Sequence, residues 1–78
     1  MEEQVREEIF RILEKSGLEN PRMEGGSIIV TKKLPFGDGE LPNLRSFGFD
    51  VPVCEGIGRR KPGGFVFKME IIYRFLEE

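Results

Sequence analysis

An alternating apolar run in the last quarter of the sequence most constrains the fold. Every second residue from 65 to 75 is apolar: Phe65, Phe67, Met69, Ile71, Tyr73 and Phe75. Successive side chains of a β-strand point to opposite faces, so this period of two predicts a strand with one buried face. A helix over residues 68–77 is the alternative, because Met69, Ile72 and Leu76 also fit a helical stripe. The unbroken alternation and the aromatic content favour the strand.

The first segment predicts an amphipathic helix over residues 2–16. Val5, Ile9 and Leu13 recur at the spacing of one helical face, which would be buried. Lys15 lies where the helix dipole favours a cation, and Gly17 suits a left-handed C-cap. We therefore expect the helix to pack through this stripe.

The middle of the chain predicts two further strands, over residues 27–33 and 45–53. The first is rich in β-branched residues, and the second alternates apolar and polar positions. Residues 19–26, 34–43 and 55–64 are rich in Gly and Pro and are predicted to be connections. The prediction is one α+β domain over residues 1–78, with the helix packed on a three-stranded, mainly antiparallel sheet whose successive strands pair.

The small size of the chain raises the question of what else stabilises it. A domain of 78 residues builds a modest core, and its single cysteine excludes an internal disulfide. With no histidine in the chain, we expect no metal site and no cofactor. If the final strand extends over residues 65–76, its twelve residues would span about 40 Å. A domain of this size is only about 30 Å across. The strand could bend at a bulge, end in a helical turn, or lie against a second copy, and a homodimer of the third kind would also protect the sheet edge.

Charge and hydropathy restrict the location of the protein. No apolar run approaches the roughly 18 residues needed to span a bilayer, and the first residues are acidic and polar. We expect a soluble cytoplasmic protein without a membrane partner. The calculated pI of about 5.2 disfavours nucleic-acid binding as the main role.

A basic, glycine-rich loop over residues 56–64 is the strongest candidate for ligand binding. Arg59, Arg60 and Lys61 could neutralise a phosphate, a carboxylate or a nucleic acid. The glycine spacing matches no phosphate-binding motif, so a solvated hairpin tip is the alternative. Lys32 and Lys33 would extend the basic surface, but consecutive antiparallel strands would place them at the opposite end of the sheet.

Catalysis is not expected, because the sequence shows no activated nucleophile and no paired acid and base. The predicted function is that of a small non-enzymatic interaction or adaptor protein. It would be homodimeric, with a further protein partner unknown, and would act through its sheet edge and loops. The predicted interface residues lie on the final strand: Phe65, Phe67, Met69, Ile71 and Tyr73. The alternative is a nucleic-acid or phosphate-ligand binding module that uses the basic loop.

Overall fold

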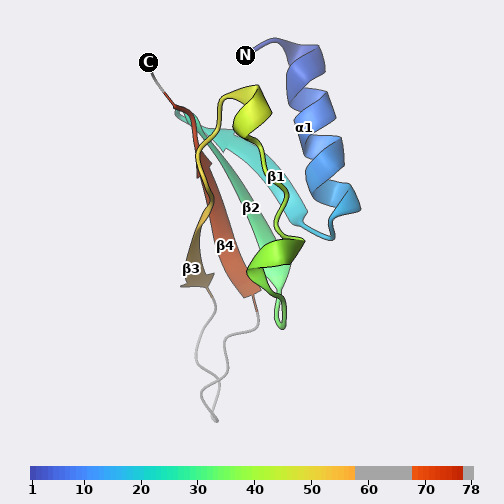
Figure 1. The fold of residues 1–78 in the computed structure, drawn as a ribbon, viewed down its shortest axis with the longest axis vertical. Coiled ribbons are helices and arrows are strands. Elements are labelled where there is room, and N and C mark those ends of the chain that lie inside the picture. Colours follow the sequence, from blue (N-terminus) through green and yellow to red (C-terminus); the bar gives the residue numbers. More distant parts are fainter. Residues whose placement is uncertain (58–67, 77–78) are drawn as a thin grey trace.

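The structure, a computed structural model, describes residues 1–57 and 68–76. One helix, α1 (Glu3–Lys15), precedes four strands, β1 (Glu19–Glu24), β2 (Ser27–Lys33), β3 (Val53–Ile57) and β4 (Lys68–Arg74). The strands form one antiparallel sheet in the order β1-β2-β4-β3, with α1 on one face (Figure 1). The α+β class and the helix packed on an antiparallel sheet are thereby confirmed, with four strands instead of three.

Helix α1 forms as the apolar periodicity predicts. Ile9 and Leu13 are fully buried against the sheet, and the charged residues of the helix are exposed. The helix ends at Ser16 and Gly17, and the Lys32 Nζ donates a hydrogen bond of 2.8 Å to the Ser16 carbonyl oxygen. A cation therefore compensates the negative end of the helix dipole. No helix within the described ranges is long and apolar enough to cross a membrane.

Gly17 is expected to be intolerant of a side chain. Its φ of +81° is left-handed, and an added Cβ would lie 2.9 Å from the Lys32 Nζ. Gly17→Ala should therefore lower the free energy of unfolding by about 1–2 kcal/mol, measured by urea denaturation. Repeating it in a Lys32→Met background isolates the contact with the lysine. An equal loss of unfolding free energy in both backgrounds would show that the contact with Lys32 contributes nothing to the effect of Gly17→Ala.

The sequence predicted residues 19–26 to be a connection, but they contain strand β1 and a hairpin turn. Gly25 has a φ of +60° between the paired residues Glu24 and Ser27, as a two-residue hairpin turn requires. Pro21 is tolerated because β1 is an edge strand and its register shifts between Glu19 and Arg22. In the sequence, the Gly25-Gly26 pair indicates this hairpin turn, but Pro21 argued against a strand before it.

Strand β4 lies at the centre of the sheet, between β2 and β3. Its register pairs Ile72 with both Ile29 and Val53, so the strand interpretation is confirmed over the helical one. Of the predicted pairings between successive strands, that of β2 with β3 is wrong, since β4 separates them and they run parallel to each other, whereas β3 and β4 do pair. β2 and β4 each contain seven residues, so the described part of β4 does not outgrow its neighbour.

The predicted strand over residues 45–53 is mostly absent. Arg45–Phe47 form a 3-10 turn, Gly48 has a φ of +90°, and only an isolated bridge joins Phe49 to Phe75. An added Cβ at Gly48 would lie 3.1 Å from the Phe75 ring, so the close approach of this ring requires glycine. The alternating residues of this segment thus form a 3-10 turn followed by the buried Phe49, instead of a continuous strand.

The core lies between the sheet, α1 and the crossover that joins β2 to β3, residues 34–52 (Figure 1). The crossover contributes Leu44 and Phe49, which are at most 1% exposed, and the Tyr73 hydroxyl donates a hydrogen bond of 2.9 Å to the Pro42 carbonyl oxygen. The fully or nearly fully buried residues are Ile9, Leu13, Leu18, Ile28, Val30, Leu44, Phe49, Ile71 and Tyr73. They occupy one face of the sheet, and the other face has no covering layer among the described residues.

Candidate interaction surface

The uncovered side of the sheet, which we call the open face, carries an apolar row across three strands. Ile29, Ile72 and Val53 are direct cross-strand neighbours on β2, β4 and β3. Ile29 and Ile72 are half-buried, and Val53 is 45% exposed. Three adjacent β-branched side chains with no second layer over them form a plausible centre for a protein contact.

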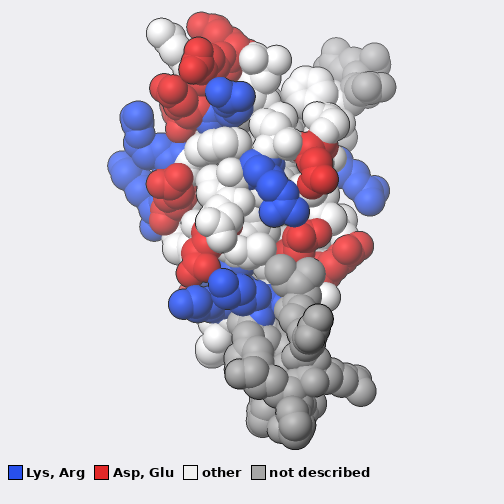
Figure 2. Space-filling model, turned by 180° about the vertical axis from the view of Figure 1, so that it is seen from behind, with Lys and Arg blue, Asp and Glu red and all other residues white. Residues whose placement is uncertain are grey.

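Charged residues surround the apolar row on the open face, with both signs equally represented (Figure 2). The register places four basic and four acidic residues there: Arg22, Lys33, Lys68, Arg74, Glu19, Glu24, Glu55 and Glu70. A surface with an apolar centre and a balanced charged rim resembles a protein-binding surface more than the single-sign field of a nucleic-acid binder.

The charges on the β1 side of the open face are compensated within the protomer. The Arg22 guanidinium lies 3.4 Å from the Glu24 carboxylate and 3.6 Å from the Glu70 carboxylate. The Glu19 carboxylate lies 3.3 Å from the Lys68 Nζ and 3.8 Å from the Lys33 Nζ. These pairs are partly exposed, so each contributes little to stability.

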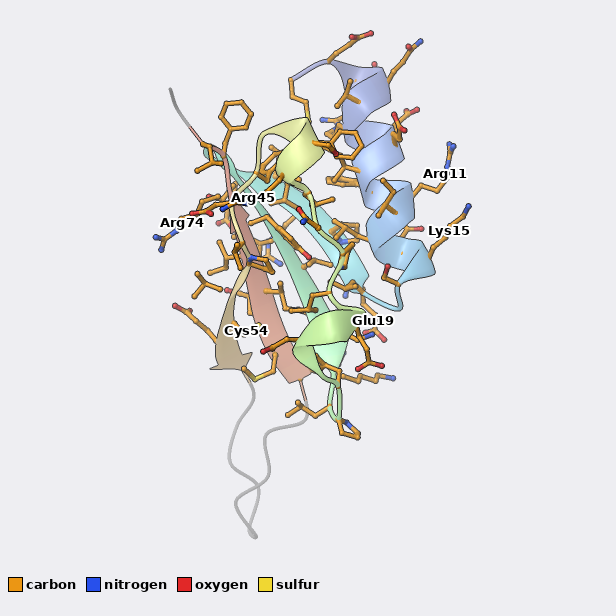
Figure 3. All side chains as sticks on the ribbon, in the orientation of Figure 1. Arg11, Lys15, Glu19, Arg45, Cys54 and Arg74 are labelled. Atoms are coloured by element: carbon orange, nitrogen blue, oxygen red, sulfur yellow. The ribbon has the colours of Figure 1, made fainter. Side chains whose placement is uncertain are left out.

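The charges toward β3 are not compensated in this way. Among the described residues, no ion pair involves Arg74 or Glu55. Glu55 is the direct cross-strand neighbour of Glu70, so two carboxylates oppose each other in the sheet. Arg74 is exposed and projects outward from β4 (Figure 3). This half of the open face therefore carries one cation with no ion pair among the described residues, beside the facing carboxylates of Glu55 and Glu70.

Lys33 does not lie at the opposite end of the sheet from the described residues that flank 58–67. Lys33 pairs with Lys68, which also pairs with Ile57, so the residues that flank 58–67 adjoin the end of β2. The error came from the predicted order of strands. Arg59, Arg60 and Lys61 themselves lie outside the described residues. Lys32 caps α1, and its Nζ lies 5.9 Å from the centre of the Phe36 ring, so its charge serves the fold.

The described members of the predicted interface set lie on the core face of β4. Ile71 and Tyr73 are fully buried in the core, and Met69 is half-buried on the same face, so none is presented by the open face. Phe65 and Phe67 lie outside the described residues. The alternation correctly indicated a strand, but the residues that β4 places on the open face are the intervening ones, which form a mixed row around Ile72 in the sequence.

A shallow groove of about 290 Å³ lies between the crossover and the start of β3. Its lining includes Asp38, Asp50 and Cys54, and the Cys54 side chain lies between β3 and the 3-10 turn Asp38–Glu40 (Figure 3). Burial, and then the nearby Asp38 carboxylate, raise the pKa of the Cys54 thiol. Asp50 accepts a hydrogen bond from the Val51 amide and lies 3.8 Å from Arg45. The thiol is thus poorly suited to act as a nucleophile.

Tyr73 provides a test of the core through pH. Burial, and then Cys54, raise the pKa of its hydroxyl above the usual value of 10.0. The unfolded chain would ionise first, so stability should be retained below about pH 10 and fall above it by about 1.4 kcal/mol per pH unit. Urea denaturation in a Cys54→Ser background should show this fall, and Tyr73→Phe should remove it. Tyr73 is the only tyrosine, so tyrosinate absorbance that rises near pH 10 in the intact fold would contradict the prediction.

The described residues contain no group of three or more His, Cys, Asp or Glu residues arranged to hold a metal ion. Comparison with protein-family models, with curated proteins and with solved structures finds no match to the chain.

Proposed function

We propose that the chain is a small protein-interaction module that acts by surface contact and self-associates through the open face of its sheet. The observation that carries the proposal is the apolar row of Ile29, Ile72 and Val53 within a balanced charged rim. Desolvating such a row favours association, while the rim supplies specificity. The proposal keeps the homodimer expected from the sequence but replaces its basis, because the described β4 is no longer than β2.

A non-enzymatic role is part of the proposal. Its support is the raised pKa of the Cys54 thiol, which lowers the fraction of nucleophilic thiolate at neutral pH. We also expect the module to act in the cytoplasm, where its single cysteine would stay reduced. Further protein partners would compete with the second copy for the same surface.

Chemical-shift mapping by NMR tests where the contact lies. On dilution of the labelled protein, the amide signals of Ile29, Ile72 and Val53 should shift together toward monomer values. The signals of exposed residues on α1, such as Arg11 and Lys15, provide the control because they face away from the sheet (Figure 3). Shifts confined to α1, or no dependence on concentration, would contradict the proposal.

A second candidate function is binding of nucleic acid or another phosphate ligand at the end of the sheet that carries Lys33 and Lys68. The observation that favours it is their direct pairing, with residues 58–67 beginning and ending beside them. The basic run Arg59-Arg60-Lys61 belongs to that segment by sequence. The Glu19 carboxylate, which is shared by Lys33 and Lys68, reduces the positive charge available.

Salt dependence tests this second function. Binding of a fluorescent single-stranded RNA should weaken steeply as salt rises, because each neutralised phosphate releases a counterion. Changing Arg59, Arg60 and Lys61 to alanine should reduce the slope, and Lys33→Gln should reduce it further. Lys15→Gln on the exposed side of α1 is the matched control. Absence of salt-sensitive binding at low ionic strength would exclude the function.

A further inference from the structure

We infer that the second copy packs face to face on the open face, about a two-fold axis that runs across the strands through Ile72. The inference rests on the proposed function and specifies its geometry. Glu70, Ile72 and Arg74 lie on the same face of β4, two residues apart. Because a strand rises about 3.4 Å per residue, Arg74 and Glu70 lie about 7 Å from Ile72 in opposite directions.

A rotation about this axis reverses the direction of the strands. Ile72 then meets Ile72 of the second copy, and Arg74 of each copy meets Glu70 of the other, so that the same ion pair forms twice. Each Arg74 would also approach Glu55, the cross-strand neighbour of Glu70. The cation that has no ion pair among the described residues thereby reaches the two carboxylates that oppose each other.

The alternative axis, parallel to the strands, fits less well. If it ran between β2 and β4, Ile29 would meet Ile72, but Lys33 of one copy would meet Lys68 of the other. Arg74 would meet Ser27 and would gain no ion pair. Both axes bring some like charges together, but of the two only the axis across the strands gives Arg74 an ion-pair partner in the second copy, so this axis is favoured.

The charges at the β1 edge do not prevent this arrangement. The axis across the strands brings the Arg22 residues of the two copies toward each other, but each lies beside its own Glu24 and Glu70. The same rotation brings Glu19 toward Glu24 of the second copy, and each of these carboxylates has a cation in its own protomer. The strands of packed sheets also cross at about 30°, which displaces the outer strands relative to each other.

The expected affinity follows from the area. The four strands have five to seven residues each, so at about 3.4 Å per residue and 4.8 Å between strands the face measures about 400 Å² and pairing would bury roughly 800 Å² in total. This is small for a specific interface, so we expect a weak dimer with a dissociation constant in the micromolar range.

Charge reversal tests the geometry. Arg74→Glu alone and Glu70→Arg alone should each weaken self-association about tenfold or more, because each homodimer would then contain two repulsive pairs. An equimolar mixture of the two variants should recover the wild-type affinity, since both pairs are attractive in the heterodimer. In its own sheet, Glu70→Arg places a cation opposite Glu55 but also beside Arg22, which loses its ion pair with Glu70, so circular dichroism must verify the fold of this variant. Native mass spectrometry would distinguish the heterodimer from both homodimers.

Cross-linking provides a second measurement that does not depend on charge. In a Cys54→Ser background, Ile72→Cys lies on the axis and should give dimers with a short bismaleimide, which is needed because facing sheets lie about 10 Å apart. Lys33→Cys, which lies far from the axis, should give little. Two results would overturn the inferred geometry while leaving self-association intact. One is a mixture of Arg74→Glu and Glu70→Arg that shows no preference for the heterodimer, and the other is equal cross-linking through Ile72→Cys and Lys33→Cys. A monomeric wild-type protein would overturn the proposed function as well.

Discussion

Ile72→Glu is expected to abolish self-association, raising the dissociation constant about a hundredfold or more. Ile72 lies at the centre of the open face, between Ile29 and Val53. In the inferred dimer, the substitution buries two facing carboxylates near Glu70, and an uncompensated charge at the centre of an interface costs about 3 kcal/mol or more. The protomer should remain folded, because the side chain is only half-buried. Concentration-dependent light scattering, with circular dichroism to verify the fold, measures the effect.

The matched control is Leu34→Glu. Leu34 is 41% exposed, follows β2 in the crossover and lies outside the open face, so it also exchanges a partly exposed apolar side chain for a carboxylate. Its dissociation constant should remain within a few-fold of the wild-type value. Equal weakening by both variants would show that net charge, and not the location of Ile72, controls association.

Ile71→Ala and Ile72→Ala are expected to differ sharply although the residues are adjacent. Ile71 is fully buried in the core, and its truncation should lower the free energy of unfolding by about 3 kcal/mol. A domain of this size has a total stability of about 4–12 kcal/mol, so the loss is a large fraction. Ile72→Ala should cost about 1 kcal/mol in the dilute protomer, since its side chain lies on the open face.

Urea denaturation at concentrations below the dissociation constant measures both losses without a contribution from the dimer. A conservative Ile71→Val variant serves as the control, with an expected loss of about 1 kcal/mol. Equal losses for the two alanine variants would contradict the assignment of Ile71 to the core and Ile72 to the open face.

The sequence predicted those elements whose local pattern agrees with their tertiary environment. The periodicity of α1 and the β-branched run of β2 indicated both elements with nearly correct bounds. Strand β1 was missed because Pro21 is compatible with a strand only at an edge, and a single sequence does not reveal which strands are edges. The segment over residues 45–53 was misassigned because its alternation conceals Gly48, whose left-handed backbone interrupts any strand.

The location of the candidate interaction surface depends on the order of the strands, which local sequence patterns do not contain. The sequence identified Ile71 and Tyr73 as apolar and aligned, but burial by the crossover assigns them to the core. Lys33 was placed away from residues 58–67 because successive strands were expected to pair, whereas β4 lies between β2 and β3. The register of β4 with both neighbours reveals the row of Ile29, Ile72 and Val53.

Sedimentation equilibrium of the wild-type chain tests the central claim most directly. The account predicts a mass that rises from that of one 9.0 kDa chain at nanomolar concentration to twice that value above the micromolar range. The same experiment on Ile72→Glu should give the single-chain mass throughout. A wild-type protein that remains monomeric across this range, or an Ile72→Glu variant that still dimerises, would contradict self-association through the open face.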